Sequence, residues 1–329
     1  MKKLLALALV LILVLASGAA LAGESVVLYY SHAADWSDPI IKEFQDETGI
    51  TVELVGAGTG ELISRIIAES ENPLGDILWG GVAESYLPIA DYLEGYESPE
   101  LQNLIPGTYD AETFKWSAFD IEPMVMVYST KLVAPEDAPK RWDDLLNEKW
   151  KGQIACADPI KSSSSFATLQ AIIAAYGQKD GGGFEFVKKF VPNLDGKVLS
   201  SSSGTYKGVS DGEYTIGLTY EEAALKYIAA GSEMAIVYPE EGTNVNNSPV
   251  AIIKNGPNTE NAKKFVDFVL GKKVQEQLAA LNRRSSRTDV ELPANFLPTQ
   301  NIARADYDIG WVVENTEAFK DLWKDLVTQ

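Results

Sequence analysis

Four short segments rich in serine, threonine and glycine could bind an anion. Each follows a stretch typical of a β-strand, and three immediately precede a predicted helix. The first turn of a helix has unpaired N–H groups and the positive end of the helix dipole, and hydroxyl groups add further donors. Several such ends at one place would hold a phosphate, phosphonate or carboxylate without a lysine. The candidates are Ser31 and His32; Thr59 and Gly60; Ser162, Ser163 and Ser164; and Ser202, Ser203 and Thr205.

Helix capping is the alternative explanation for each of these segments, because serine and glycine are also the usual residues at helix ends. All four segments follow predicted strands, and open α/β sheets bind ligands at the carboxyl ends of their strands, so both explanations stay open on the residues alone. The glycines at 56, 58 and 60 do not form a dinucleotide fingerprint, because the spacing of the third glycine and a distal acidic partner are not convincing.

The elements that must position these segments alternate between strands and helices, which predicts α/β lobes with parallel cores. The predicted strands are 25–30, 51–55, 76–79, 124–128, 152–157, 197–199, 214–218, 234–238 and 250–253. The predicted helices start near 39 and 61 and then cover 142–150, 166–176, 184–191, 205–211, 260–270, 273–281 and 313–327.

This order predicts two lobes joined by a hinge. Residues 23–119 together with 239–329 form the first lobe, and residues 120–238 form the second. Two crossings of the chain at one waist would make a hinge, with the ligand cleft between the lobes.

The N-terminus reads as a secretory signal peptide, residues 1–22. Lys2 and Lys3 precede an apolar run, and Ala20-Leu21-Ala22 supplies the small residues of a cleavage site. The apolar run is too short for a membrane span, which needs roughly 20 residues. We therefore expect a soluble, periplasmic protein that is not inserted in the membrane after cleavage.

Charge and residue usage limit the function. The formal charge of −19 disfavours nucleic acid and anionic membranes as partners. One histidine and one cysteine leave little for a metal cluster, or for a nucleophile with a positioned base. We expect no cofactor, and a secreted enzyme is a weak alternative.

Several stretches, in order along nearly the whole mature chain, resemble the periplasmic receptors of bacterial ABC importers, in the branch that includes ferric-iron, phosphosugar and phosphonate binders. The stretches are 30–32, 58–62, 72–81, 126–133, 211–218 and 258–265. The resemblance implies the type II periplasmic-binding-protein fold, an α/β fold with two hinged lobes. It also implies an ABC permease and its ATPase as partners, and we expect a monomer.

The same resemblance bears on the ligand. Ferric members have a tyrosine pair where this chain has Tyr220-Glu221, and an acidic residue where it has Gly80-Gly81. A ferric site would therefore have to use His32, Tyr220 and Glu221. The alternative is a phosphosugar or phosphonate, with Glu221 accepting hydrogen bonds from ligand hydroxyls or an amine.

Two further features leave the identity of the ligand undecided by the sequence. Trp79 and Tyr220 could form apolar walls of the cleft, with Gly80 beside them, or they could belong to the core. Together with the acidic composition, Trp79, Tyr220 and Glu221 also permit polyamine binding, although the serine-rich helix ends would then face a cation.

Overall fold

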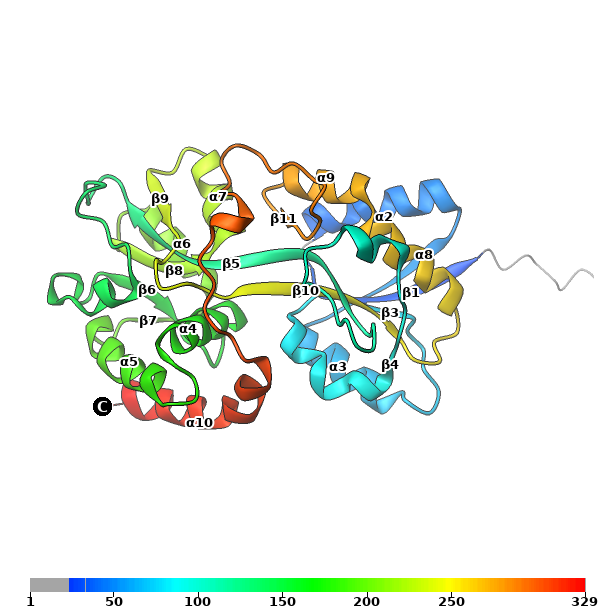
Figure 1. Ribbon diagram of the computed structural model, residues 1–329, viewed down its shortest axis with the longest axis horizontal. Helices are drawn as coiled ribbons and strands as arrows, with labels where there is room; N and C mark the ends of the chain where they lie inside the picture. The colour runs from blue at the N-terminus through cyan, green and yellow to red at the C-terminus, as the bar shows by residue number, and fades with distance from the viewer. Residues whose placement is uncertain (1–23, 33, 329) are drawn as a thin grey trace, which may run out of the picture.

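The computed structural model describes residues 24–32 and 34–328 and has a mixed α/β architecture (Figure 1). The predicted signal peptide, residues 1–22, lies outside the described residues. Among the described residues, no helix combines the length and the apolar composition that a membrane span needs.

The first third of the chain forms three parallel strands connected by helices. β1 (Ser25–Tyr30) pairs with β2 (Thr51–Gly56) on one side and with β3 (Ile77–Trp79) on the other. The connecting helices are α2 (Ala34–Thr48) and α3 (Thr59–Ala68). These elements confirm the predicted alternation. The ends of β1 and β3, and the start of α3, meet at one edge of this sheet.

Two long strands connect the halves of the molecule and run side by side between two groups of helices (Figure 1). β5 (Ser117–Ser129) pairs antiparallel with β10 (Val245–Ile253) along its first part. Its second part pairs with β8 (Ile216–Tyr220) and β9 (Met234–Val237). The sheet therefore continues from one half into the other, in the order β2-β1-β3-β10-β5-β8-β6-β7.

Both crossing strands are longer than the sequence predicts. The prediction stops short because the additional residues include polar ones. A parallel or central strand normally reads as an apolar run. Here the buried Asp120 accepts a hydrogen bond from Arg283 at 2.5 Å, and the buried Asn246 accepts one from Asn244. Tertiary partners make these polar residues compatible with a buried strand.

The second half repeats the strand–helix pattern. β6 (Ile154–Ala157) lies parallel to β8 and to β7 (Val198–Leu199). The helices α4 (Ser163–Tyr176) and α6 (Ser202–Ser210) begin earlier than predicted, so serines expected in loops form first helical turns. Serine has modest helix propensity, yet it is common at the start of a helix, where its hydroxyl can accept hydrogen bonds from unpaired backbone N–H groups.

The C-terminal part returns to the second half. After α8 (Thr259–Leu270) and α9 (Lys272–Ala280), β11 (Arg284–Ser285) pairs with β5. Residues 286–304 then cross over, bridging first from Arg287 to Leu104 and then from Arg304 to Thr243. The last helix, α10 (Ile309–Val327), follows this third crossing.

Two large apolar clusters form the core, one in each half. The first includes Phe44 and Phe265, and the second includes Trp142. Phe319 and Trp323 of α10 belong to the second cluster. Residues 239–329 are expected in the first lobe, but α10 packs on the second half, because residues 286–304 carry the chain across.

Short elements complete the fold. They are η1 (Ala83–Ser85), η2 (Leu87–Tyr92), β4 (Leu93–Glu94), η3 (Pro99–Asn103), η4 (Trp142–Leu146), η5 (Glu148–Trp150), α5 (Gly182–Phe190), η6 (Val191–Leu194), α7 (Glu221–Ala229) and η7 (Thr299–Asn301).

Candidate ligand-binding site

A cavity of about 530 Å³ has walls from both halves of the molecule. The first half contributes the end of β1, the start of α2 and the segment after α9, and the second contributes α4, α6 and α7. The lining residues are Ser31, His32, Trp36 and Arg283; Glu122 of β5; and Ser163, Ser164, Ser202, Tyr206, Lys207, Tyr220, Glu222, Ala223, Lys226 and Tyr227. Thus the structure brings together Ser31, His32, Ser163, Ser164, Ser202 and Tyr220 of the predicted site.

The first turns of two helices border this cavity. Ser163 and Ser164 belong to the first turn of α4, and Ser202 is the first residue of α6. Within the described chain, the Ser201 side chain makes no capping hydrogen bond to α6. Both helix starts therefore present amide donors and hydroxyls to an anion.

Three other predicted serines and threonines have local roles. Ser162 Oγ accepts a hydrogen bond from the Ser165 N–H at 3.2 Å and caps α4. Thr205 is buried, and its hydroxyl donates to the Ser202 carbonyl at 2.7 Å. The Ser203 hydroxyl lies 3.1 Å from that of the exposed Ser201. Capping and turn formation account for these three, and none of them lines the cavity.

Thr59 and Gly80 contact the cavity-lining residues Ser31 and His32 without lining the cavity themselves. The Thr59 hydroxyl donates to Ser31 Oγ at 3.0 Å. A Cβ atom at Gly80 would lie 2.6 Å from Ser31 Oγ and 2.7 Å from His32 Nε2, and Gly80 has a φ of +116°. Glycine is therefore required for this close approach. Gly60 follows Thr59 in the first turn of α3 and does not line the cavity.

His32 lies in an aromatic cluster at the cavity wall. Its ring centroid is 4.7 Å from that of Trp36 and 4.8 Å from that of the fully buried Trp79. Burial, followed by the nearby Arg283 charge, holds the pKa of His32 well below its usual range. Within the described residues, the buried His32 Nε2 has no hydrogen-bond partner. His32 is thus neutral, and Trp79 belongs to the core rather than to the cavity surface.

Three basic residues line the cavity although the protein is acidic overall. They are Arg283, Lys207 of α6 and Lys226 of α7. Arg283 Nε donates to Asp120 at 2.5 Å, and its guanidinium lies 4.3 Å above the Trp36 ring. These contacts fix the guanidinium at the wall, where it favours a negatively charged ligand.

Glu221 does not line this cavity, contrary to the expectation that it contacts the ligand. Its carboxylate is buried and forms a two-point ion pair with Arg284, at 2.6 and 2.9 Å. Tyr238 also donates a hydrogen bond to it. Both carboxylate oxygens of Glu221 therefore accept hydrogen bonds from within the protein, and the ion pair with Arg284 connects α7 to β11.

The acidic residues of the cavity are Glu222 and Glu122. Burial raises the pKa of Glu122 to about 8; Arg283 opposes this rise, and Asp120, Glu222 and Glu221 add to it. A carboxyl with such a pKa is mostly protonated at neutral pH in the ligand-free cavity.

Three phenols also face the cavity. Tyr206 and Tyr220 have ring centroids 6.3 Å apart, and those of Tyr206 and Tyr227 are 4.8 Å apart. Burial raises the pKa of Tyr206 and that of Tyr220, which disfavours their phenolates. Among the described residues, no group of three or more His, Cys, Asp and Glu side chains is arranged to hold a metal ion.

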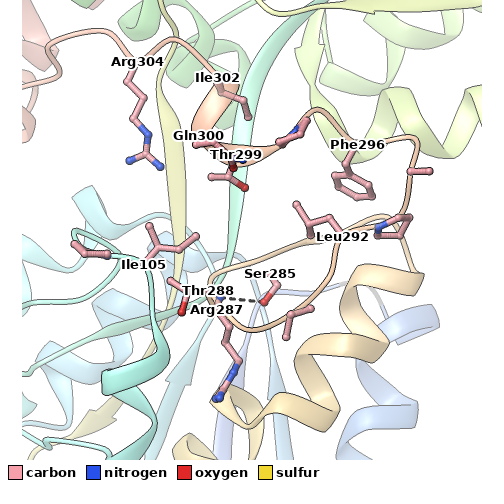
Figure 2. A pocket seen from close by; sticks show the side chains of 15 residues that line it. Ile105, Ser285, Arg287, Thr288, Leu292, Phe296, Thr299, Gln300, Ile302 and Arg304 are labelled. Atoms are coloured by element: carbon pink, nitrogen blue, oxygen red, sulfur yellow. Dashed lines mark hydrogen bonds between the residues drawn. The ribbon is translucent and has the colours of Figure 1, made fainter.

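A second cavity, of about 990 Å³, lies beside the third crossing. Figure 2 shows Arg304 and Ile105 toward one side of it, and Phe296 and Leu292 toward the other. Its walls come from residues 285–304 and from Ile105 and Pro106, so it is separate from the serine-lined cavity.

Sequence reasoning missed most charged residues of the serine-lined cavity. One usable signal was the spacing of Glu222, Ala223, Lys226 and Tyr227, which places them on one face of a helix. Tyr206 and Lys207 similarly follow Ser202 by about one turn. No local signal marks Glu122 or Arg283, because pairing of β11 with β5 sets their positions.

Comparison with known proteins gives one family match. Residues 39–303 match the family described as bacterial extracellular solute-binding protein. A similar protein is the iron uptake protein A1 of Synechocystis sp., 28% identical, covering 79% of this chain and 74% of the relative. Another is a putative 2-aminoethylphosphonate-binding periplasmic protein of Salmonella typhimurium, 27% identical, covering 85% of this chain and 84% of the relative.

Solved structures agree on the fold. The periplasmic binding protein AfuA from Actinobacillus pleuropneumoniae, with exogenous fructose-6-phosphate bound, has a TM-score of 0.78, 24% identity, and coverage of 93% of this chain and 99% of that one. The apo ferric ion-binding protein A of Pasteurella haemolytica has a TM-score of 0.79, 22% identity, and coverage of 92% and 98%. The fold is thus the type II periplasmic-binding-protein fold, as expected.

Proposed function

Because the chain belongs to the bacterial extracellular solute-binding proteins, we propose that it captures a small organic phosphate or phosphonate for an ABC importer. The ligand would bind in the serine-lined cavity between the two halves. The receptor would then present it to a permease that is driven by an ATPase. A periplasmic location after signal-peptide cleavage, and a monomeric state, complete the proposal.

The cationic lining of the cavity carries this proposal. Arg283, Lys207 and Lys226 gather in one cavity of a protein whose formal charge is −19. The starts of α4 and α6 add amide and hydroxyl donors. An anion would gain from all of these groups at once, whereas a polyamine would be repelled by them.

Capture would proceed by closure of two lobes. The proposed first lobe is 23–119 with 239–329 and the second is 120–238, amended so that α10 moves with the second lobe. Strands β5 and β10 and residues 286–304 would bend between them. A ligand that contacts both lobes stabilises the closed state by its additional contacts in that state.

Ferric iron is the second candidate ligand. Tyr206, Tyr220 and Tyr227 with Glu222 offer hard oxygen donors in the same cavity, and one similar protein is named for iron uptake. Three observations weigh against this candidate. The cavity contains basic residues, burial disfavours two of the phenolates, and the buried His32 nitrogen packs against Gly80.

Titration calorimetry of the protein, with fructose 6-phosphate, ethylphosphonate and ferric nitrilotriacetate as probes, distinguishes these ligands. We expect a phosphate or phosphonate to bind one per chain, and Arg283→Gln to weaken binding by about 2–5 kcal/mol. The exposed Arg141→Gln is the matched control and should bind normally. Binding of ferric iron alone, with a visible phenolate absorption band, would instead support the iron receptor.

A further inference from the structure

We propose that Glu122 and Glu222 make the serine-lined cavity selective for a phosphate or phosphonate that also carries a protonated amine. This inference rests on the proposed function and adds a positive group to its ligand. The basic residues and helix starts would take the anion, and the two glutamates would take the ammonium.

The position of Glu122 is the starting observation. It lies on the crossing strand β5 and lines the cavity together with Glu222 of α7. Within the described residues, no side chain or backbone group donates a hydrogen bond to its carboxylate, and no cation lies within ion-pair distance of it. Because this carboxyl lines the cavity and has no donor among these residues, a ligand in the cavity can supply one.

The neighbouring charges do not provide that donor. Arg283 forms an ion pair with Asp120, with Nε 2.5 Å from Oδ2. Its Nη1 lies 3.8 Å from Glu222 Oε2. Glu221 is matched by Arg284. The charged groups that act most strongly on the pKa of Glu122 are the Arg283 guanidinium and the Asp120, Glu222 and Glu221 carboxylates, and Lys207 and Lys226 line the same cavity.

An ammonium group fits this environment better than a hydroxyl does. It can donate up to three hydrogen bonds, and its positive charge favours the ionised form of a neighbouring carboxyl. A ligand hydroxyl donates one hydrogen bond and carries no charge that would favour ionised Glu122. An amine on the ligand would also stabilise the ionised form of Glu122, whose pKa of about 8 in the ligand-free cavity keeps it largely protonated. Binding at neutral pH would therefore release a proton from Glu122.

The test compares 2-aminoethylphosphonate with ethylphosphonate, which lacks only the amine. We expect the wild-type protein to bind the amine-bearing probe about tenfold more tightly or better. Glu122→Gln should remove most of this preference, which is measured as the ratio of the two dissociation constants. Glu213→Gln, which removes an exposed negative charge from the second half, is the matched control and should keep the preference. Calorimetry in two buffers of different ionisation enthalpy should show proton release that disappears in Glu122→Gln.

The outcomes separate this inference from the proposed function. Equal binding of the two phosphonates by the wild-type protein would overturn the amine subsite and leave the anion receptor standing, and this comparison needs no variant. A preference that survives in both Glu122→Gln and Glu222→Gln would also overturn it, as would tighter binding of fructose 6-phosphate than of 2-aminoethylphosphonate. Failure of every phosphate and phosphonate to bind would instead refute the proposed function.

Discussion

Glu221 and Glu222 show that adjacent residues of one type have different roles. They are the first two residues of α7, and consecutive helical residues point about 100° apart. Glu221 points into the protein and pairs with Arg284, while Glu222 lines the cavity. From the sequence we expect Glu221 to contact the ligand, whereas its neighbour Glu222 is the residue that lines the cavity.

Glu122 should give the stability of the ligand-free protein a distinctive pH dependence. Its pKa rises from 4.5 to about 8 on folding, so between these values the native state holds more protons than the unfolded state. The free energy of unfolding must therefore fall as pH rises through this range, by at most about 1.4 kcal/mol per pH unit from this group.

Urea denaturation of wild type and Glu122→Gln at several pH values from 5 to 8 measures this contribution. The wild-type value should decrease relative to that of the variant as pH increases. Parallel curves for the two proteins would show that the carboxyl titrates normally.

At the scale of elements, the helix starts and the buried ion pair serve different purposes. The first turns of α4 and α6 are directed to the cavity, whereas α7 is attached to the fold through Glu221. Arg284 extends that attachment to residues 286–304, because it donates to Leu297 O at 2.8 Å and to Thr299 Oγ1 at 2.7 Å. One side chain thus joins α7, β11 and the third crossing.

Arg284→Met should lower the free energy of unfolding by about 3–5 kcal/mol, because it leaves the buried Glu221 carboxylate without a matching cation. The double variant Glu221→Leu with Arg284→Met should recover part of that loss. Lys131→Met, which breaks an exposed pair with Glu233, should change stability by less than about 1 kcal/mol. Chemical denaturation checks all three, and a double variant no more stable than Arg284→Met would contradict this explanation.

Ser163→Asp should separate anion binding from helix stability. A carboxylate at the start of α4 stabilises the helix by about 0.3–1 kcal/mol, yet it places a negative charge at the cavity. We expect unchanged or higher melting temperature and at least about tenfold weaker binding of ethylphosphonate. Thr259→Asp adds the same charge at the start of α8, outside the cavity lining, and should bind normally. Equal affinities of the two variants would remove the α4 start from the site.

For the molecule as a whole, three crossings determine how the halves can move. β5 and β10 form a continuous sheet, and residues 286–304 run beside a cavity of about 990 Å³ (Figure 2). A sheet bends more easily than it slides, because sliding would break its hydrogen bonds. We therefore expect bending about these connections, with the second cavity changing shape as the lobes close.

Small-angle X-ray scattering should show a smaller radius of gyration when 2-aminoethylphosphonate or fructose 6-phosphate saturates the protein. Melting temperature should rise in parallel, since a ligand at 100 times its Kd stabilises the native state by about 2.7 kcal/mol. Arg283→Gln measured under the same conditions should remain extended. A ligand that raises the melting temperature without compaction would argue against closure.

The sequence by itself determined the α/β class, most of the strand–helix order and the serine-rich segments at the starts of helices. Hydrophobic periodicity and helix-start chemistry are local, so they can be read along the chain. Only the tertiary structure decided that Arg283 and Glu122 face one cavity, that Glu221 is committed to Arg284, and that α10 packs on the second half. These facts depend on pairing between β5 and β11 and on a crossing by residues 286–304. Contacts between residues so far apart in the chain leave no periodic pattern in the sequence.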